Sequence, residues 1–123
     1  MYDLNITTNE EMSEKYEDST FSIEDIQADI YEITVDGEFA GFIAYTIENV
    51  PEIGWTAYIE AVELLEKFQG QGVYRQICAD LMESEELDAI AGENKGAKGV
   101  EYKNIIIGGS RVYSLWVRFN NQN

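Results

Sequence analysis

The sequence ELLEKFQGQGVY occupies residues 63–74 and decides the fold that we expect. A strand-like run ends at Leu65, and a polar loop with Gly70 and Gly72 follows it. Beyond the loop, apolar residues recur at helical spacing. They are Val73, Tyr74, Ile77, Cys78, Leu81 and Met82. A glycine loop that opens a helix presents backbone N–H groups and the positive end of the helix dipole, so this segment predicts a binding site for a phosphate.

The spacing of the two glycines excludes the commonest phosphate-binding motifs. Arg75 stands where the dinucleotide fingerprint GxGxxG has its third glycine, and no GxxxxGK[ST] sequence follows a strand. A tight turn that binds no ligand is the alternative interpretation of the loop. Lys67 and Arg75, two of only eight basic residues in the chain, flank the loop and favour an anionic ligand.

Strand signals precede the loop along the chain. Residues 2–6 alternate apolar and polar side chains, as a half-buried strand does. Residues 30–35 and 39–47 flank Asp36-Gly37, a favoured two-residue hairpin turn, and residues 55–65 form a third strand-like run.

Helix signals are fewer. Thr8 is the expected N-cap of a first helix, with Glu11 three residues later as in a capping box, and a short second helix is expected over residues 23–29. Residues 93–103 indicate a loop, and residues 105–107 a buried strand. The order predicts an α/β (α+β) fold, a mixed and mostly antiparallel sheet flanked by helices, in a single domain over residues 1–123.

Gln69-Gly70-Gln71-Gly72-Val73-Tyr74 resembles the acetyl-CoA loop of the GCN5-related N-acetyltransferases, the GNAT family. That loop has Gln or Arg, then Gly three residues later, then Gly or Ala two further on. It follows the fourth strand and opens the third helix. The hairpin around Asp36-Gly37 is similar to the second and third strands of the family. The sixth position departs from the pattern, because Tyr74 replaces a small residue.

The resemblance implies acetyl-CoA as co-substrate. Its binding residues are expected along the approach and the loop. They are Leu64, Leu65, Gln69, Gly70, Gln71, Gly72, Val73 and Tyr74. The family also uses a tyrosine on its last helix as the acid that protonates the thiolate, and Tyr113 is the nearest candidate. The last third of the chain is less similar, and we expect a member of the family that lacks the last strands.

Glu60 is the candidate general base. Side chains on a strand alternate, so Glu60 is in phase with Tyr58, Val62 and Leu64. Partial burial on that face would raise the pKa of the Glu60 carboxyl toward a useful range. Several members of the family also carry a glutamate on this strand. The alternative is an exposed strand residue without a catalytic role.

Composition narrows the chemistry further. The chain has no histidine, which excludes Ser-His-Asp and Cys-His hydrolases, and no sequence motif indicates a metal site. Its one cysteine, Cys78, lies on the apolar side of the expected helix, where it is expected to pack rather than react. A single unpaired cysteine without a signal peptide or membrane segment predicts a cytoplasmic protein.

Charge is distributed unevenly along the chain. Residues 1–66 carry 17 acidic side chains and one lysine, whereas residues 67–123 carry seven of each sign. The resulting field repels nucleic-acid phosphates and attracts cations. We therefore expect an N-acetyltransferase that acts directly on a cationic amine, a protein lysine or a small polyamine. The alternative is a non-catalytic acidic inhibitor of a basic or nucleic-acid-binding partner. An unpaired sheet edge would also allow a homodimer.

Overall fold

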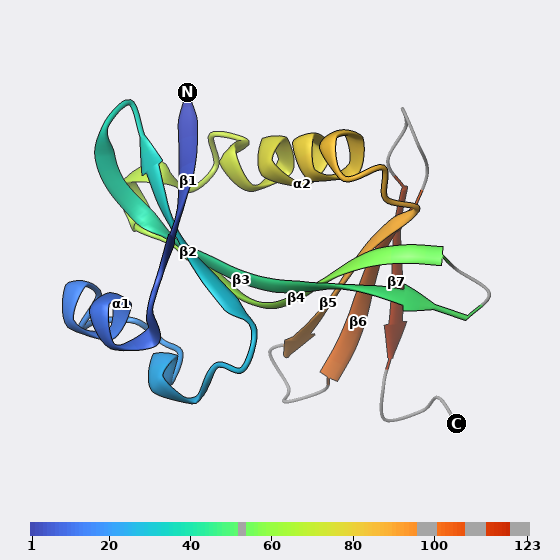
Figure 1. The fold of residues 1–123 in the computed structure, drawn as a ribbon, viewed down its shortest axis with the longest axis horizontal. Coiled ribbons are helices and arrows are strands. Elements are labelled where there is room, and N and C mark those ends of the chain that lie inside the picture. The colour runs from blue at the N-terminus through green and yellow to red at the C-terminus, as the bar shows by residue number, and fades with distance from the viewer. Residues whose placement is uncertain (52–53, 96–100, 108–112, 119–123) are drawn as a thin grey trace. The chain divides into compact units, whose positions relative to one another are not determined.

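The computed structural model describes residues 1–51, 54–95, 101–107 and 113–118, with side chains described up to Ala91. Figure 1 shows the elements in chain order. They are β1 Tyr2–Thr7, α1 Asn9–Lys15, η1 Ile23–Asp25, β2 Asp29–Val35, β3 Glu38–Val50, β4 Gly54–Leu64, η2 Glu66–Phe68, α2 Val73–Ser84, β5 Ala89–Lys95, β6 Glu101–Ile107 and β7 Tyr113–Arg118. The η elements are single turns of 3₁₀ helix.

The first helix begins where the capping signal places it. The Glu11 backbone N–H donates to Thr8 Oγ1 at 3.1 Å, as an N-cap threonine requires. The helix ends at Lys15, and the second predicted helix is shorter than expected. It is the single turn η1, and β2 already begins at Asp29, the residue where that helix was expected to end.

The β2–β3 hairpin is confirmed with its turn. Asp36 and Gly37 both have positive φ, +51° and +84°, which is typical of the two-residue turns that match strand twist. Pairing shifts by one residue between Ile33 and Thr34, because Ile33 pairs with Gly41 and Thr34 with Phe39. This bulge leaves Ala40 as the extra residue on β3.

The strands form one sheet in the order β1 to β7, and the expected mixed, mostly antiparallel fold is confirmed. β4 and β5 pair in parallel, from Thr56 opposite Ala89 to Ile59 opposite Gly92. The pairs β1–β2, β2–β3, β5–β6 and β6–β7 are antiparallel. The loop expected over residues 93–103 is correspondingly shorter, because β5 and β6 extend into both of its ends.

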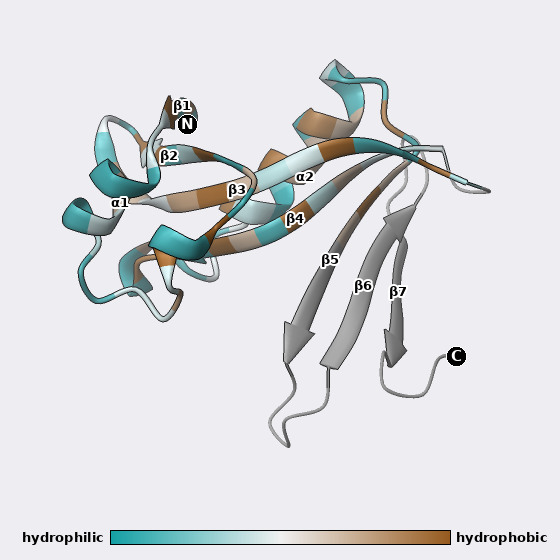
Figure 2. Ribbon diagram, turned by 60° about the horizontal axis from the view of Figure 1, so that its bottom comes forward, coloured by the Kyte–Doolittle hydropathy of each residue, from teal (hydrophilic) through white to brown (hydrophobic). Residues whose placement is uncertain are grey.

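The chain divides into two compact units, and β3 and β4 contribute to both. Unit 1 comprises residues 1–46 and 60–73, and unit 2 residues 47–59 and 74–123. Figure 2 shows the apolar stretch of β3, of which residues 40–44 are buried. The core of unit 1 joins α1 and η1 to the strands. It contains Met12, Tyr16, Ile23, Ile26, Ala28, Ile30, Phe42, Ala44 and Ala61. In unit 2, Tyr58 packs on Ala89 and Ala91.

Candidate functional site

The end of β4 is fixed against β3 by a close backbone approach. Gly41 has φ +146°, and a side chain there would overlap the carbonyl oxygen of Glu63. The Leu65 backbone N–H donates to the Ala40 carbonyl at 2.8 Å. Leu64 and Leu65 are half-buried, and Leu65 packs against the core of unit 1. The loop that follows β4 therefore begins at a fixed position.

The loop is held by its own glutamine side chains. Gln69 Nε2 donates to the Leu64 carbonyl at 2.9 Å, and Gln71 Nε2 donates to the Lys67 carbonyl at 2.9 Å. Gly70 and Gly72 have φ +77° and +80°, values that other residues seldom adopt. Both glutamines are exposed, and each holds the loop backbone through a side-chain amide.

The bend leaves backbone donors exposed. Among the residues that the structure describes, none accepts a hydrogen bond from the N–H groups of Gly70, Gln71, Gly72 or Val73. A Cβ atom built on either glycine would meet no atom within 4 Å, so space lies over the loop. These N–H groups stand at the start of the twelve-residue helix α2. The arrangement suits an anion, and the sequence of the loop predicted a phosphate site at this place.

Lys67 is the basic group next to these donors. Its Nζ lies 2.6 Å from Glu38 Oε2, in a pair whose two side chains are mostly exposed, and 5.4 Å from the centre of the Phe68 ring. The surface pair is worth about 1 kcal/mol or less, so an incoming phosphate could displace Glu38 at small cost.

Tyr74 and Cys78 lie one turn apart on α2 and share a hydrogen bond. Burial is the main cause that raises the pKa of the Tyr74 hydroxyl well above its usual range. Burial likewise raises the pKa of the Cys78 thiol to about 11, and the bond with Tyr74 partly opposes that shift. Both groups are therefore neutral at pH 7. Cys78 is buried, as the helical spacing predicted.

Glu60 lies on β4 but is exposed, so the partial burial expected from strand alternation is wrong. Its carboxylate accepts hydrogen bonds from the backbone N–H groups of Gln27, at 3.1 Å to both oxygens, and of Ala28, at 2.9 Å. These two donors belong to the segment that leads into β2. That segment comes close enough to bond Glu60, and this is why neighbouring strand residues did not predict the surroundings of Glu60.

Glu63 makes a second set of contacts that the sequence did not single out. Its carboxylate accepts from Ser19 Oγ at 2.6 Å, from the Thr20 N–H at 3.1 Å and from Thr20 Oγ1 at 3.2 Å. The Tyr16 hydroxyl also bonds Glu63, and burial together with this carboxylate raises the pKa of Tyr16. An available signal was the position of Glu63 between Ala61 and Leu65, on the face of β4 that enters the core.

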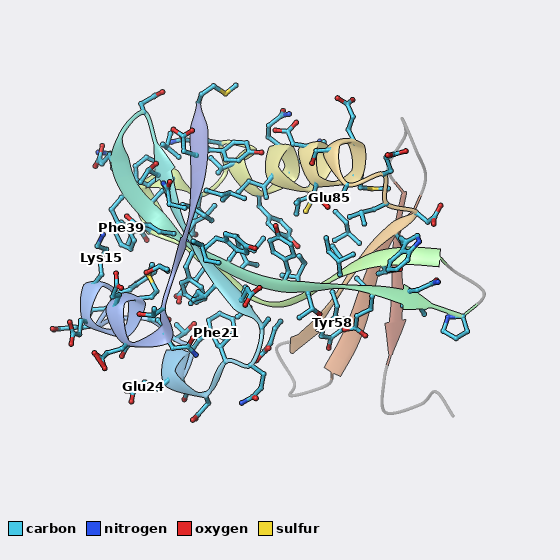
Figure 3. The ribbon with its side chains drawn as sticks, in the orientation of Figure 1. Lys15, Phe21, Glu24, Phe39, Tyr58 and Glu85 are labelled. Atoms are coloured by element: carbon cyan, nitrogen blue, oxygen red, sulfur yellow. The ribbon has the colours of Figure 1, made fainter. Side chains whose placement is uncertain are left out.

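The segment bonded by Glu63 borders a hollow of about 330 Å³ in unit 1. Its lining combines carboxylates, hydroxyls and two aromatic rings. The lining residues are Ser13, Tyr16, Glu17, Ser19, Phe21, Ser22, Ile23, Glu24 and Asp25. Figure 3 shows Phe21 and Glu24 at the α1 end of unit 1. Phe21 is 40% exposed, and carboxylates beside an aromatic face favour a cationic group.

Residues 1–100 match the model of the "Acetyltransferase (GNAT) family". The chain belongs to this acetyltransferase family. No curated protein matches the chain.

Three solved structures are similar to this GNAT chain. A ribosomal-protein-alanine N-acetyltransferase from Brucella melitensis biovar Abortus 2308 is 15% identical, with a TM-score of 0.51 over 75% of this chain and 80% of that chain. The loading GNATL domain of CurA from Lyngbya majuscula is 15% identical, with a TM-score of 0.49 over 76% of this chain and 65% of that chain. The NatC complex bound to Gag peptide and CoA is 16% identical, with a TM-score of 0.43 over 72% of this chain and 54% of that chain. The first of these shows the GNAT fold.

Tyr113 is placed differently from the resemblance. It begins strand β7 instead of lying on a helix, and β6 and β7 pair with each other. Its side chain lies outside the described ones, so its role as the acid stays a prediction. The described residues contain no cluster that could hold a metal ion and no helix long and apolar enough to cross a membrane.

Proposed function

We propose that this GNAT domain transfers an acetyl group from acetyl-CoA directly to a cationic amine, a lysine of a basic protein or a small polyamine. Membership of the acetyltransferase family supports acetyl transfer in general. The observation that supports acetyl-CoA as the acetyl donor is the loop over residues 69–73. This loop has two glycines with positive φ, and its N–H groups have no hydrogen-bond acceptor among the described residues.

The loop fits the pyrophosphate of acetyl-CoA by its chemistry. The N–H groups of Gln71, Gly72 and Val73 would donate to phosphate oxygens, and the open space over both glycines would admit them. Leu64, the last residue of β4, and Leu65 are half-buried. The rest of the acetyl-CoA molecule would lie beside them. Tyr74, half-buried and protonated, would contribute contact surface rather than charge.

Glu60 is the proposed base. Transfer requires that the ammonium lose a proton before its nitrogen attacks the thioester carbonyl, and that the departing thiolate gain one as the C–S bond breaks. The Glu60 carboxylate is held by two N–H donors, and its exposure leaves it open to an approaching amine. Tyr113 is the proposed acid.

Binding of acetyl-CoA is testable by thermal shift. Because a ligand that binds only the folded state stabilises it by RT ln(1 + [L]/Kd), acetyl-CoA at about 100 times its Kd should add about 2.7 kcal/mol and raise Tm clearly. No shift at millimolar acetyl-CoA would contradict the proposal.

Gly72→Asp and Gly72→Asn form a matched pair that tests the loop itself. Asp and Asn tolerate positive φ about equally, and the site has room for either Cβ, so both should cost similar folding free energy. Only Asp places a negative charge among the amide donors. We expect Gly72→Asp to weaken acetyl-CoA binding at least about tenfold more than Gly72→Asn does, which is about 1.4 kcal/mol. Equal affinities for the two variants would show that no phosphate binds here.

A further inference from the structure

Glu63 joins the end of β4 to a segment that lies 43–44 residues earlier in the chain. One oxygen accepts from Ser19 Oγ and the other from Thr20 Oγ1, and the Thr20 N–H donates to both. Tyr16 adds its hydroxyl. All of these donors lie in the segment between α1 and η1.

The backbone of Glu63 is itself fixed. β3 approaches so closely at Gly41 that no side chain fits there, and Leu65 is hydrogen-bonded to Ala40. The carboxylate therefore extends from a rigid point of the sheet. A segment bonded to it acquires the same fixed position.

The bonded segment forms part of the hollow. Tyr16 and Ser19 line it directly, and Ser19 Oγ also accepts a hydrogen bond from the Phe21 N–H at 3.0 Å, so the position of Phe21 depends on the same contact. On the other side, Asn9 Nδ2 donates to the carbonyls of Ile23 and Ile26 and holds η1. The hollow thus has one wall fixed by Asn9 and one by Glu63.

We propose that Glu63 is a positioning residue that sets the shape of the hollow for the cationic acceptor. This inference rests on the proposed function, in which the acceptor is an amine. The Glu63 oxygens are occupied by donors of the wall, so the charges that meet an ammonium group in the hollow are those of Glu17, Glu24 and Asp25. Glu63 acts on the acceptor through Tyr16, Ser19 and Phe21, and not by contact.

The test compares Glu63→Ala with Glu63→Gln, and Asp3→Asn serves as a control for the loss of an exposed charge on β1. Spermidine is the probe, and its Kd is measured by calorimetry beside that of acetyl-CoA. Amide hydrogen exchange at Thr20 and Phe21 reports the order of the wall. Alanine removes every acceptor, whereas the carbonyl oxygen of glutamine can still accept from Ser19 and Thr20.

We expect Glu63→Ala to speed exchange at both amides and to weaken spermidine binding, each by about tenfold or more, as loss of hydrogen bonds to a charged acceptor implies. Glu63→Gln should stay within about threefold of the parent in both measurements, and Asp3→Asn should match the parent. The Kd of acetyl-CoA should change less than about twofold in all three, because the loop is held by other bonds. Should Glu63→Ala not fold, Ser19→Ala removes the 2.6 Å bond from the other side and should give the same pattern.

Three outcomes would overturn the positioning role. The first is a Glu63→Gln protein that is no better than Glu63→Ala, which would make the charge of Glu63 the important property. The second is unchanged amide exchange in Glu63→Ala, and the third is a parent protein that does not bind spermidine. Failure of the proposed function is distinct. A parent that binds spermidine but not acetyl-CoA would contradict acetyl transfer and leave the effect of Glu63 on the hollow intact.

Discussion

Cys78 is buried on α2 with the Tyr74 hydroxyl bonded to it. Burial disfavours the thiolate more than this bond favours it, so the pKa of the thiol rises from 9.0 to about 11. Because the thiolate is the reactive form, a cysteine of this kind packs and does not act as a nucleophile. The proposed direct acetyl transfer needs no cysteine, and burial removes the exposure that a reactive thiol requires.

Alkylation by iodoacetamide should show this directly. Between pH 8 and pH 10 the rate at Cys78 in the folded protein should rise about tenfold per pH unit, without a plateau below the folded-state pKa. At pH 8 it should be roughly 100-fold slower than in urea-unfolded protein, in which the thiol has its ordinary pKa. A plateau near pH 9 in the folded protein would contradict the assigned environment.

For individual residues, the sequence predicted the backbone of the glycine loop better than the surroundings of Glu60, the candidate base. Gly70 and Gly72 both have positive φ, a conformation that glycine adopts readily. Two glycines in the sequence therefore predicted the bend, because backbone conformation is a local property. The contacts of Glu60 and Glu63 are with residues more than thirty positions away, and strand alternation contains no information about such partners. It therefore predicted burial for Glu60, which is exposed, and left the role of Glu63 unrecognised.

The strands β3 and β4 approach each other closely at one glycine, Gly41. Gly41 combines φ +146° with the overlap that any Cβ would make with the Glu63 carbonyl. The bulge at Ala40 immediately precedes this glycine on β3. The close approach of β3 to the end of β4, next to the proposed acetyl-CoA site, thus requires that residue 41 have no side chain.

Gly41→Ala should accordingly destabilise the protein. The backbone conformation alone costs a non-glycine residue about 1–3 kcal/mol, and the overlap with backbone atoms adds to it. We expect the free energy of unfolding in urea to fall by at least about 2 kcal/mol. Gly37→Asn is the control, since its φ is also positive but its Cβ would meet no atom within 4 Å, and it should cost less than about 1 kcal/mol. Similar losses in the two variants would show that φ alone, and not the approach to β4, matters at Gly41.

Elements with a strong local signal were predicted well, and those that depend on pairing were not. Thr8 caps α1 and Asp36-Gly37 turns the hairpin because both signals act within four residues. The strand β5 begins Ala-Ile-Ala-Gly-Glu, which has little strand character by itself, and it forms beside β4 in parallel pairing. Its second half, residues 93–95, pairs with β6, and these residues were predicted as part of a loop because they have no strand signal of their own.

For the whole molecule, the decisive property is where the charge lies. Unit 1 carries 15 acidic residues against Lys15 and Lys67, and both lysines are paired, with Glu32 and Glu38. Such a surface attracts cations over a range set by the ionic strength. It opposes the approach of an anion, so acetyl-CoA would have to bind through local donors against the general field. The two proposed substrates therefore respond to the same charge with opposite sign.

Salt should separate the two substrates and, with them, the two candidate functions. Raising NaCl from about 50 to 500 mM shortens the Debye length from roughly 14 to 4 Å, so spermidine binding should weaken at least about tenfold. Acetyl-CoA binding should weaken less than about threefold or become tighter, because screening removes repulsion by the acidic surface. Calorimetry at four salt concentrations measures both trends, and equal weakening of the two ligands would contradict this assignment of charge.

A parallel incubation with poly-L-lysine and acetyl-CoA, followed by mass spectrometry, decides between enzyme and inhibitor. Salt-sensitive binding that yields acetylated lysine supports the transferase, whereas the same binding without any product would favour the non-catalytic acidic partner.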